Sequence, residues 1–137
     1  MKLLSRTRVL MAAALIAATT AFFPAAASAG MKKEVLTLTV KASQTTSERV
    51  PFAVAGTVRF AALVTPSDDT TATLSSYNGP TIGHIALASE QADTGTTTLT
   101  EFAGVPVSGE CNVQITAATS TGSARTYRVV MFIETTN

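Results

Sequence analysis

The sequence predicts an all-β protein, an antiparallel two-sheet β-sandwich of the immunoglobulin-like or Greek-key kind with about seven to eight strands. Three observations predict it. After residue 29, apolar residues recur at every second position, without a helical period of about 3.6 residues. Thr and Val, whose branched side chains suit a pleated strand, are abundant, and Gly, Pro, Asn and Asp recur between the runs. A small β-barrel is the alternative.

The first 29 residues have the three-part pattern of a secretory signal peptide. Lys2, Arg6 and Arg8 give a positive start, and the stretch 9–23 carries no charge. The Ala-Ser-Ala sequence at 27–29 supplies small residues for cleavage, which we expect after Ala29. The apolar stretch is shorter than the roughly 18–20 residues that span a bilayer. We therefore expect export to the periplasm, cell surface or medium.

Residues 30–137 are expected to form one domain, with no membrane span in the mature protein. After loss of the leader this part has seven basic and nine acidic residues, a net charge of −2. A weakly acidic chain with scattered Lys and Arg lacks the basic surface that nucleic acid or an anionic membrane requires. The expected partner is therefore another protein or a second copy of the chain, and any small-molecule ligand is unknown.

The first strand is expected over Lys33–Ala42, because Leu36, Leu38 and Val40 alternate with polar residues. A polar link follows at 43–49. Within the next run, Val50–Val64, Pro51 has no N–H to donate and predicts a sheet edge, and Gly56 predicts a bend between two strands. After the bend, four apolar side chains are expected on one face: Val58, Phe60, Ala62 and Val64.

Turn residues divide the rest of the chain. A short strand is expected before the turn Asn78-Gly79-Pro80, and the following strand, Ile82–Ala88, is expected to place Ile85 and Leu87 on one face. The short strand before this turn spans Thr71–Tyr77. The other expected elements are a turn at 66–69, a polar loop at 89–95, an exposed strand at 96–102, a strand at 110–118 with Cys111, Val113, Ile115 and Ala117 on one face, and a central strand at 127–133 with apolar residues on both faces.

No motif predicts catalysis, a metal or a cofactor, so we expect the protein not to be an enzyme. His84 is the only histidine and Cys111 the only cysteine. Cys111 shares a face with Val113 and Ile115, which favours a buried, inert thiol. An intermolecular disulfide, or a nucleophile paired with His84, are the alternatives. No G-x-S-x-G elbow or alternating acidic calcium loop is present.

Two groups of residues are candidates for contacts with a partner. Loops on a rigid scaffold commonly carry binding residues, which favours Asp68, Asp69, Tyr77 and Asn78. The amphipathic first strand, with Leu36, Leu38 and Val40, can pair within its own domain or be donated to the open edge of a neighbour.

In size, export, Thr/Ala/Val bias, low charge and its alternating first strand, the chain resembles subunits of chaperone–usher fimbriae. Those subunits usually carry a disulfide pair and end in an alternating strand with a near-terminal aromatic residue. This chain has a single cysteine and ends in Thr135-Thr136-Asn137. The resemblance implies assembly by strand pairing.

Two functions are therefore expected from the sequence. The first is an exported, non-enzymatic structural or cell-surface protein, fimbria-like or adhesive, that assembles through β-strand edges. The alternative is a monomeric periplasmic or secreted binding or inhibitor module that uses its loops. The fold class cannot decide between them, because β-sandwiches host many functions.

Overall fold

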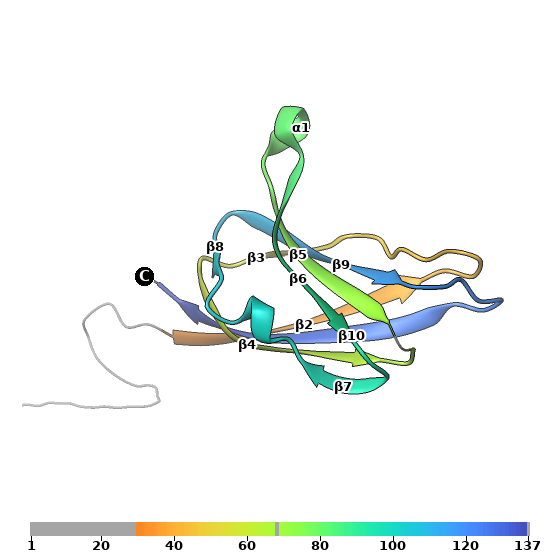
Figure 1. The fold of residues 1–137 in the computed structure, drawn as a ribbon. Helices are drawn as coiled ribbons and strands as arrows, with labels where there is room; N and C mark the ends of the chain where they lie inside the picture. The colour runs from red at the N-terminus through yellow and green to blue at the C-terminus, as the bar shows by residue number, and fades with distance from the viewer. Residues whose placement is uncertain (1–29, 68, 137) are drawn as a thin grey trace, which may run out of the picture. The chain divides into compact units, whose positions relative to one another are not determined.

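The computed structural model describes residues 30–67 and 69–136. The leader predicted over 1–29, and Asp68, lie outside the described residues. The described part contains nine strands in two sheets, one four-residue helix and one 3-10 turn (Figure 1). Because strands pair within two separate sheets, the predicted two-sheet sandwich is confirmed, with slightly more strands than expected.

The larger sheet has the order β2-β10-β4-β7, and β8 also pairs with β4. Its strands are β2 (Gly30–Val40), β4 (Gly56–Thr65), β7 (Gly95–Thr98), β8 (Pro106–Val107) and β10 (Arg125–Thr135). The prediction of a central strand near the C-terminus is confirmed, since β10 lies between β2 and β4.

The smaller sheet has the order β3-β9-β5-β6, and all its pairings are antiparallel. Its strands are β3 (Val50–Ala53), β5 (Thr70–Tyr77), β6 (His84–Ala92) and β9 (Glu110–Ala117). Pro51 lies on the edge strand β3, as its missing N–H predicts. The bend at Gly56 is confirmed, because β3 and β4 belong to different sheets.

The chain divides into two compact units. Residues 32–133 form the larger unit, whose core contains the predicted inner faces of β2 and β9. The described part of the smaller unit consists of two strand ends. Within it, Thr135 Oγ1 accepts a hydrogen bond from the Gly30 amide at 3.3 Å and donates one to the Gly30 carbonyl at 3.1 Å.

The prediction of the buried face of β4 is correct for Val58 and wrong for the residues that follow it. Val58 is buried, but Phe60 is 42% exposed. Arg59 and Phe60 are both exposed in succession, which moves the alternation by one position. The buried residues are then Ala61, Leu63 and Thr65 in place of Ala62 and Val64. Phe60 instead lies beside Phe132, with ring centroids 6.1 Å apart.

Two elements expected between residues 82 and 102 are also corrected. Ile82 belongs to the short helix α1 (Gly79–Ile82), and β6 continues to Ala92 through part of the expected loop. The expected strand at 96–102 stops at Thr98, and the 3-10 turn η1 (Thr100–Phe102) follows. Leu99 and Phe102 are fully buried there, so this stretch closes the core rather than forming an exposed strand.

Candidate interaction surface

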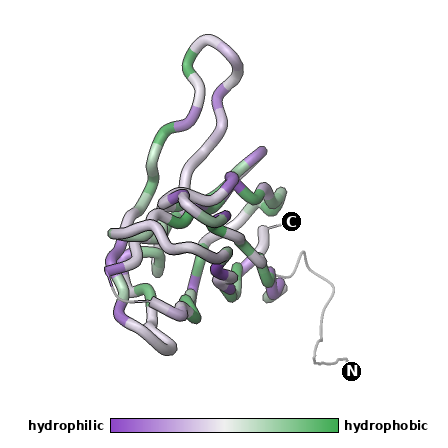
Figure 2. The backbone as a smooth tube through the Cα atoms, turned by 90° about the vertical axis from the view of Figure 1, so that its right-hand side faces the viewer, coloured by the Kyte–Doolittle hydropathy of each residue, from purple (hydrophilic) through white to green (hydrophobic). Residues whose placement is uncertain are grey.

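A hairpin formed by β5, α1 and β6 projects from the sandwich (Figure 1). Figure 2 shows the same hairpin from the side, with apolar segments along its length. The turn predicted at Asn78-Gly79-Pro80 is confirmed as the hairpin tip. Gly79 and Gly83 have φ values of 82° and 77°, which side chains disfavour, and the Asn78 amide donates to the Gly83 carbonyl at 2.8 Å.

The projecting hairpin exposes apolar side chains in α1 and β6. Ile82 at the tip is 64% exposed, and Ile85 and Leu87 are 48% and 37% exposed. Ile85 pairs with Ser76, which pairs with Cys111 of β9. Cross-strand partners share a face of the sheet, so Ile85 lies on the same face as the buried Cys111. The prediction that Ile85 shares an apolar face is therefore right about the face, but that face is uncovered at the hairpin.

Leu87 forms a β-bulge in β6. Leu74 pairs with Ala88 and Ser75 pairs with Ala86, so Leu87 has no partner residue on β5. Its side chain nevertheless points to the inner face, since it lines a hollow together with Ser76 and Cys111. Ile85 and Leu87 therefore lie on the inner face and Ala86 on the outer face. The bulge places the next residue, Ala88, on the inner face as well, because it pairs with Leu74.

The hollow beside Leu87 has a volume of about 290 Å³ and is lined by residues of both sheets. Ser76 and Cys111 come from the smaller sheet, and Pro106 and Val107 come from β8 of the larger sheet. Further along β6, Glu90 holds η1 against the strand: its Oε1 accepts from the Glu101 amide at 2.7 Å. The space between the sheets is thus filled beside Glu90 and open beside Leu87.

Of the described sheet edges, β6 is the one that exposes two large apolar side chains, Ile85 and Leu87, within an uncharged stretch. Edge strands in monomeric proteins are usually short, charged or interrupted by proline. β3 is four residues long and contains Pro51, β7 is four residues long, and β2 carries Lys32 and Lys33. β6 is nine residues long and has no Lys, Arg, Asp or Glu from His84 to Ser89. Its protective features are the bulge at Leu87 and, further along the strand, the charge of Glu90.

A polar cluster lies on the outer face of the same sheet. Asn112 is only 2% exposed, and its Nδ2 lies 2.9 Å from His84 Nδ1. Arg49 donates to Asn112 Oδ1 at 3.4 Å, and the Tyr77 and His84 ring centroids are 4.9 Å apart. The cluster therefore connects β6, β5 and β9 to the segment that precedes β3.

Cys111 and His84 do not form a catalytic pair in this structure. Cys111 pairs with Ser76, whereas His84 pairs with Tyr77, the next residue of β5, so their side chains lie on opposite faces. Burial raises the pKa of the Cys111 thiol, which disfavours the reactive thiolate. Among residues 30–67 and 69–136, no group of three or more His, Cys, Asp or Glu side chains is arranged to bind a metal.

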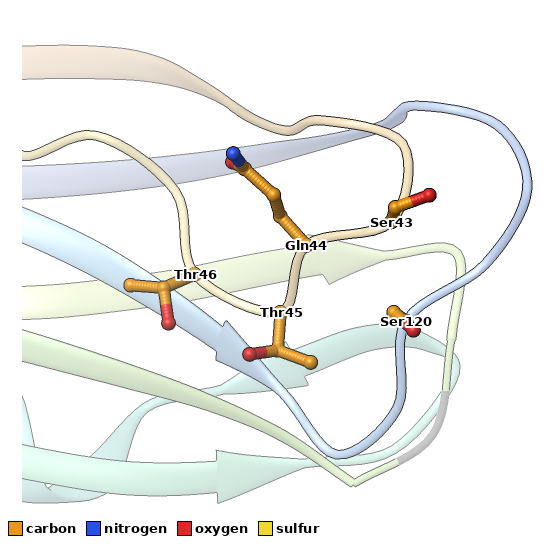
Figure 3. A pocket seen from close by; sticks show the side chains of 5 residues that line it. All are labelled: Ser43, Gln44, Thr45, Thr46 and Ser120. Atoms are coloured by element: carbon orange, nitrogen blue, oxygen red, sulfur yellow. The ribbon is translucent and has the colours of Figure 1, made fainter.

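A second hollow of about 370 Å³ lies at the other end of β9 (Figure 3). Thr46 forms an isolated bridge with Thr116, and the Ala117 amide donates to the Thr45 carbonyl at 2.7 Å. The hollow is open and lined by hydroxyl and amide side chains: Ser43, Gln44, Thr45, Thr46 and Ser120. Sequence reasoning treated 43–49 only as a linker and did not identify it.

The other candidate residues from the sequence are placed as follows. Leu36, Leu38 and Val40 are buried in the core of their own domain, so donating them to a neighbour would require β2 to leave the sandwich. Asp69 has φ 53° and accepts from Gln91 Nε2 at 3.1 Å. Tyr77 and Asn78 lie near the hairpin tip, at the opposite end of β5 from Asp69.

Within the part of the chain that the structure describes, no helix is long and apolar enough to cross a membrane. No family model matches the sequence, and no curated protein matches it either. One similar solved structure is described as "Bacillus endospore appendages form a novel family of disulfide-linked pili". The TM-score is 0.41 at 14% identity, over 81% of this chain and 94% of that chain. A likeness of this size supports no statement about the function of this chain.

Proposed function

We propose that the protein is an exported structural or surface component that assembles with protein partners through the free edge of β6. One observation carries the proposal. β6 is a nine-residue strand at the edge of the smaller sheet, it has no Lys, Arg, Asp or Glu from His84 to Ser89, and it exposes Ile85 and Leu87. The edge thus combines unpaired backbone with apolar side chains, the two features that β-strand addition uses.

The hollow beside Leu87 supports the same proposal. In strand addition, backbone hydrogen bonds give affinity and pockets for alternate side chains give specificity. The hollow lies on the inner side of β6 and is bordered by Pro106 and Val107. A strand added to β6 would therefore place an apolar side chain next to Leu87, where it would lose contact with water.

Two further parts of the proposal rest on other residues. Export rests on the leader pattern at 1–29, which lies outside the described residues. That the protein is not an enzyme stays a prediction from the sequence; the separation of His84 and Cys111 onto opposite faces of the smaller sheet bears only on a nucleophile formed by these two residues.

Sedimentation analysis of the purified protein over a wide concentration range tests the assembly. We expect association that Leu87→Asp weakens, because a carboxylate would be buried at the new interface. Thr96→Asp, on the exposed and short β7, is the matched control and should leave association unchanged. A protein that stays monomeric at every concentration, and shows no filaments or layers in micrographs of its native cell envelope, would contradict the proposal.

A second candidate function is a monomeric binding module. The hollow in Figure 3 favours it, because its lining offers hydroxyl and amide groups without charge, a chemistry suited to a neutral polar ligand such as a sugar. A rise in melting temperature with added neutral saccharides, abolished by Gln44→Ala and retained in Ser89→Ala, would support it. An unchanged melting temperature across the saccharide panel would count against it.

A further inference from the structure

We infer that the partner at the edge of β6 is a second copy of the same chain, paired antiparallel about a two-fold axis at Ala86. This inference rests on the proposed function, since it assumes that β6 is the edge through which the protein assembles. It adds the identity of the partner, the direction of pairing and the register.

Charge favours a second copy. In a two-fold pairing each residue near the axis faces its own counterpart or a close neighbour, so any charge there meets a like charge. From Ala86 in both directions, β6 has no Lys, Arg, Asp or Glu before Glu90, and the hairpin tip has none. The other long edge, β2, has three charged residues in succession, Lys32, Lys33 and Glu34, and a two-fold pairing centred on them would bring like charges together.

The positions of the side chains select the register. Facing residues of paired strands must point to the same side of the sheet, and Ile85 and Leu87 point inward while Ala86 points outward. With Ala86 facing Ala86, Ile85 of each copy faces Leu87 of the other. Centring the pair on Ile85 would instead place Leu87 opposite Gly83, and centring it on Leu87 would place Ile85 opposite Ser89. Of these three registers, only the one centred on Ala86 matches apolar with apolar. The match covers residues 85–87, because beyond the bulge Ala88 pairs with Leu74 and points inward, whereas His84 points outward.

This register also covers the open hollow. Leu87 borders the hollow next to Val107 and Cys111. The Ile85 side chain of the second copy would lie directly across from Leu87 on the inner face, at the mouth of that hollow. The same contact occurs twice because of the two-fold axis. The pairing thus buries four apolar side chains that each copy alone leaves exposed, and it joins the two smaller sheets into one.

Opposite charges at Ala86 test the register. Ala86→Lys and Ala86→Glu each place like charges face to face, and we expect either to raise the dimer dissociation constant by about tenfold or more. An equimolar mixture of the two variants should form a heterodimer of at least wild-type affinity. Ser89→Lys is the matched control: in this register the two lysines would lie about 20 Å apart, and the dissociation constant should hardly change.

Disulfide trapping gives an independent test in a Cys111→Ala background. Facing residues of antiparallel strands have Cα atoms about 4.5–5.5 Å apart, which a disulfide can bridge. Ala86→Cys should therefore give a covalent dimer on mild oxidation, whereas Ser89→Cys should not. Circular dichroism and melting curves of each variant show whether the domain stays folded, which is expected because both positions point outward at an edge.

The outcomes separate this inference from the proposed function. Association that survives both Ala86 substitutions but is weakened by Leu87→Asp overturns the two-fold register and leaves assembly through β6 in place. Association insensitive to Ala86 and Leu87 alike overturns both. Loss of association in each single Ala86 variant, with recovery in the mixture, supports both, because only a self-paired edge makes the two charges meet.

Discussion

The side-chain amide nitrogen of Asn112 lies 2.9 Å from Nδ1 of His84, so β9 holds the lower part of the projecting hairpin in place. Asn112 is almost fully buried although it lies on the outer face of its sheet. Its Oδ1 accepts from Arg49 at 3.4 Å, so one amide serves two partners from distant parts of the chain. The sheet and the hairpin are therefore coupled by hydrogen bonds as well as by strand pairing.

Asn112→Ala should lower the free energy of unfolding by about 1–3 kcal/mol, because it removes two hydrogen bonds that a buried side chain makes to Arg49 and His84. Urea unfolding measures the change. Thr116→Ala, on the same outer face of β9 but exposed, is the control and should change stability by less than about 0.5 kcal/mol. Equal effects of the two substitutions would show that the Asn112 contacts contribute nothing.

Tyr127 supplies a second test at the other end of β5. Its hydroxyl lies 3.0 Å from Ser67 Oγ, which lies 3.2 Å from Thr70 Oγ1, and the Tyr127 side chain is fully buried. Tyr127→Phe should cost about 1 kcal/mol. In a double-mutant cycle with Ser67→Ala, the two effects should be clearly non-additive, because both substitutions remove the same hydrogen bond. Simple additivity would mean that the two hydroxyls do not interact.

The first strand can be tested on its two faces. Leu38 is buried in the core, whereas its neighbour Thr37 is exposed. Leu38→Ala should destabilise the protein by about 2–5 kcal/mol through lost burial and the cavity left behind. Thr37→Ala should change the unfolding midpoint little. Comparable midpoints for the two variants would show that β2 does not contribute its inner face to the core.

Burial raises the pKa of the Cys111 thiol above its ordinary value of 9.0. The unfolded chain therefore loses this proton first as the pH rises. The stabilisation linked to the neutral thiol is complete below pH 9.0 and is lost as the pH rises through the higher pKa of the folded state. In urea titrations, the free energy of unfolding of the wild-type protein should therefore fall relative to that of Cys111→Ala as the pH rises above 9.0.

The same burial should make the native thiol slow to react. At neutral pH we expect iodoacetamide to modify Cys111 at least about tenfold more slowly than a cysteine placed at the exposed Thr96 in a Cys111→Ala background. Both should react equally fast in denaturant. Rapid native alkylation of Cys111 would show that the hollow beside Leu87 admits reagents to the sulfur.

Alternation alone was sufficient to predict the strands that have one face on the core. It located the buried faces of β2 and β9, and it located β10 as a central strand. It failed in β4 because Arg59 and Phe60 are both exposed, and a local change of phase of this kind has no signature in composition. It failed at the end of β6 because Ser89 and Gln91 face solvent and leave no apolar pattern to follow.

The candidate surface was harder to predict, for a different physical reason. Periodicity indicates which face of a strand is apolar, but it does not show whether another sheet covers that face. Ile85 and Leu87 were assigned to a common apolar face, and their exposure follows only from the length of the hairpin beyond β8 (Figure 1). Likewise, Arg49, His84 and Asn112 are too far apart in the sequence for any motif to predict their contact.

The pairing of β2 with β10 brings together the first and last strands of the described chain. A chain that is synthesised or threaded through a pore from its N-terminus must therefore keep β2 unpaired until about 85 further residues have emerged. During that interval β2 lacks the strand with which it pairs, and Leu36, Leu38 and Val40 form an apolar face that no sheet yet holds in place. Closure of the domain is thus a late event, and a helper that shelters this strand in the meantime would speed folding and reduce misassembly.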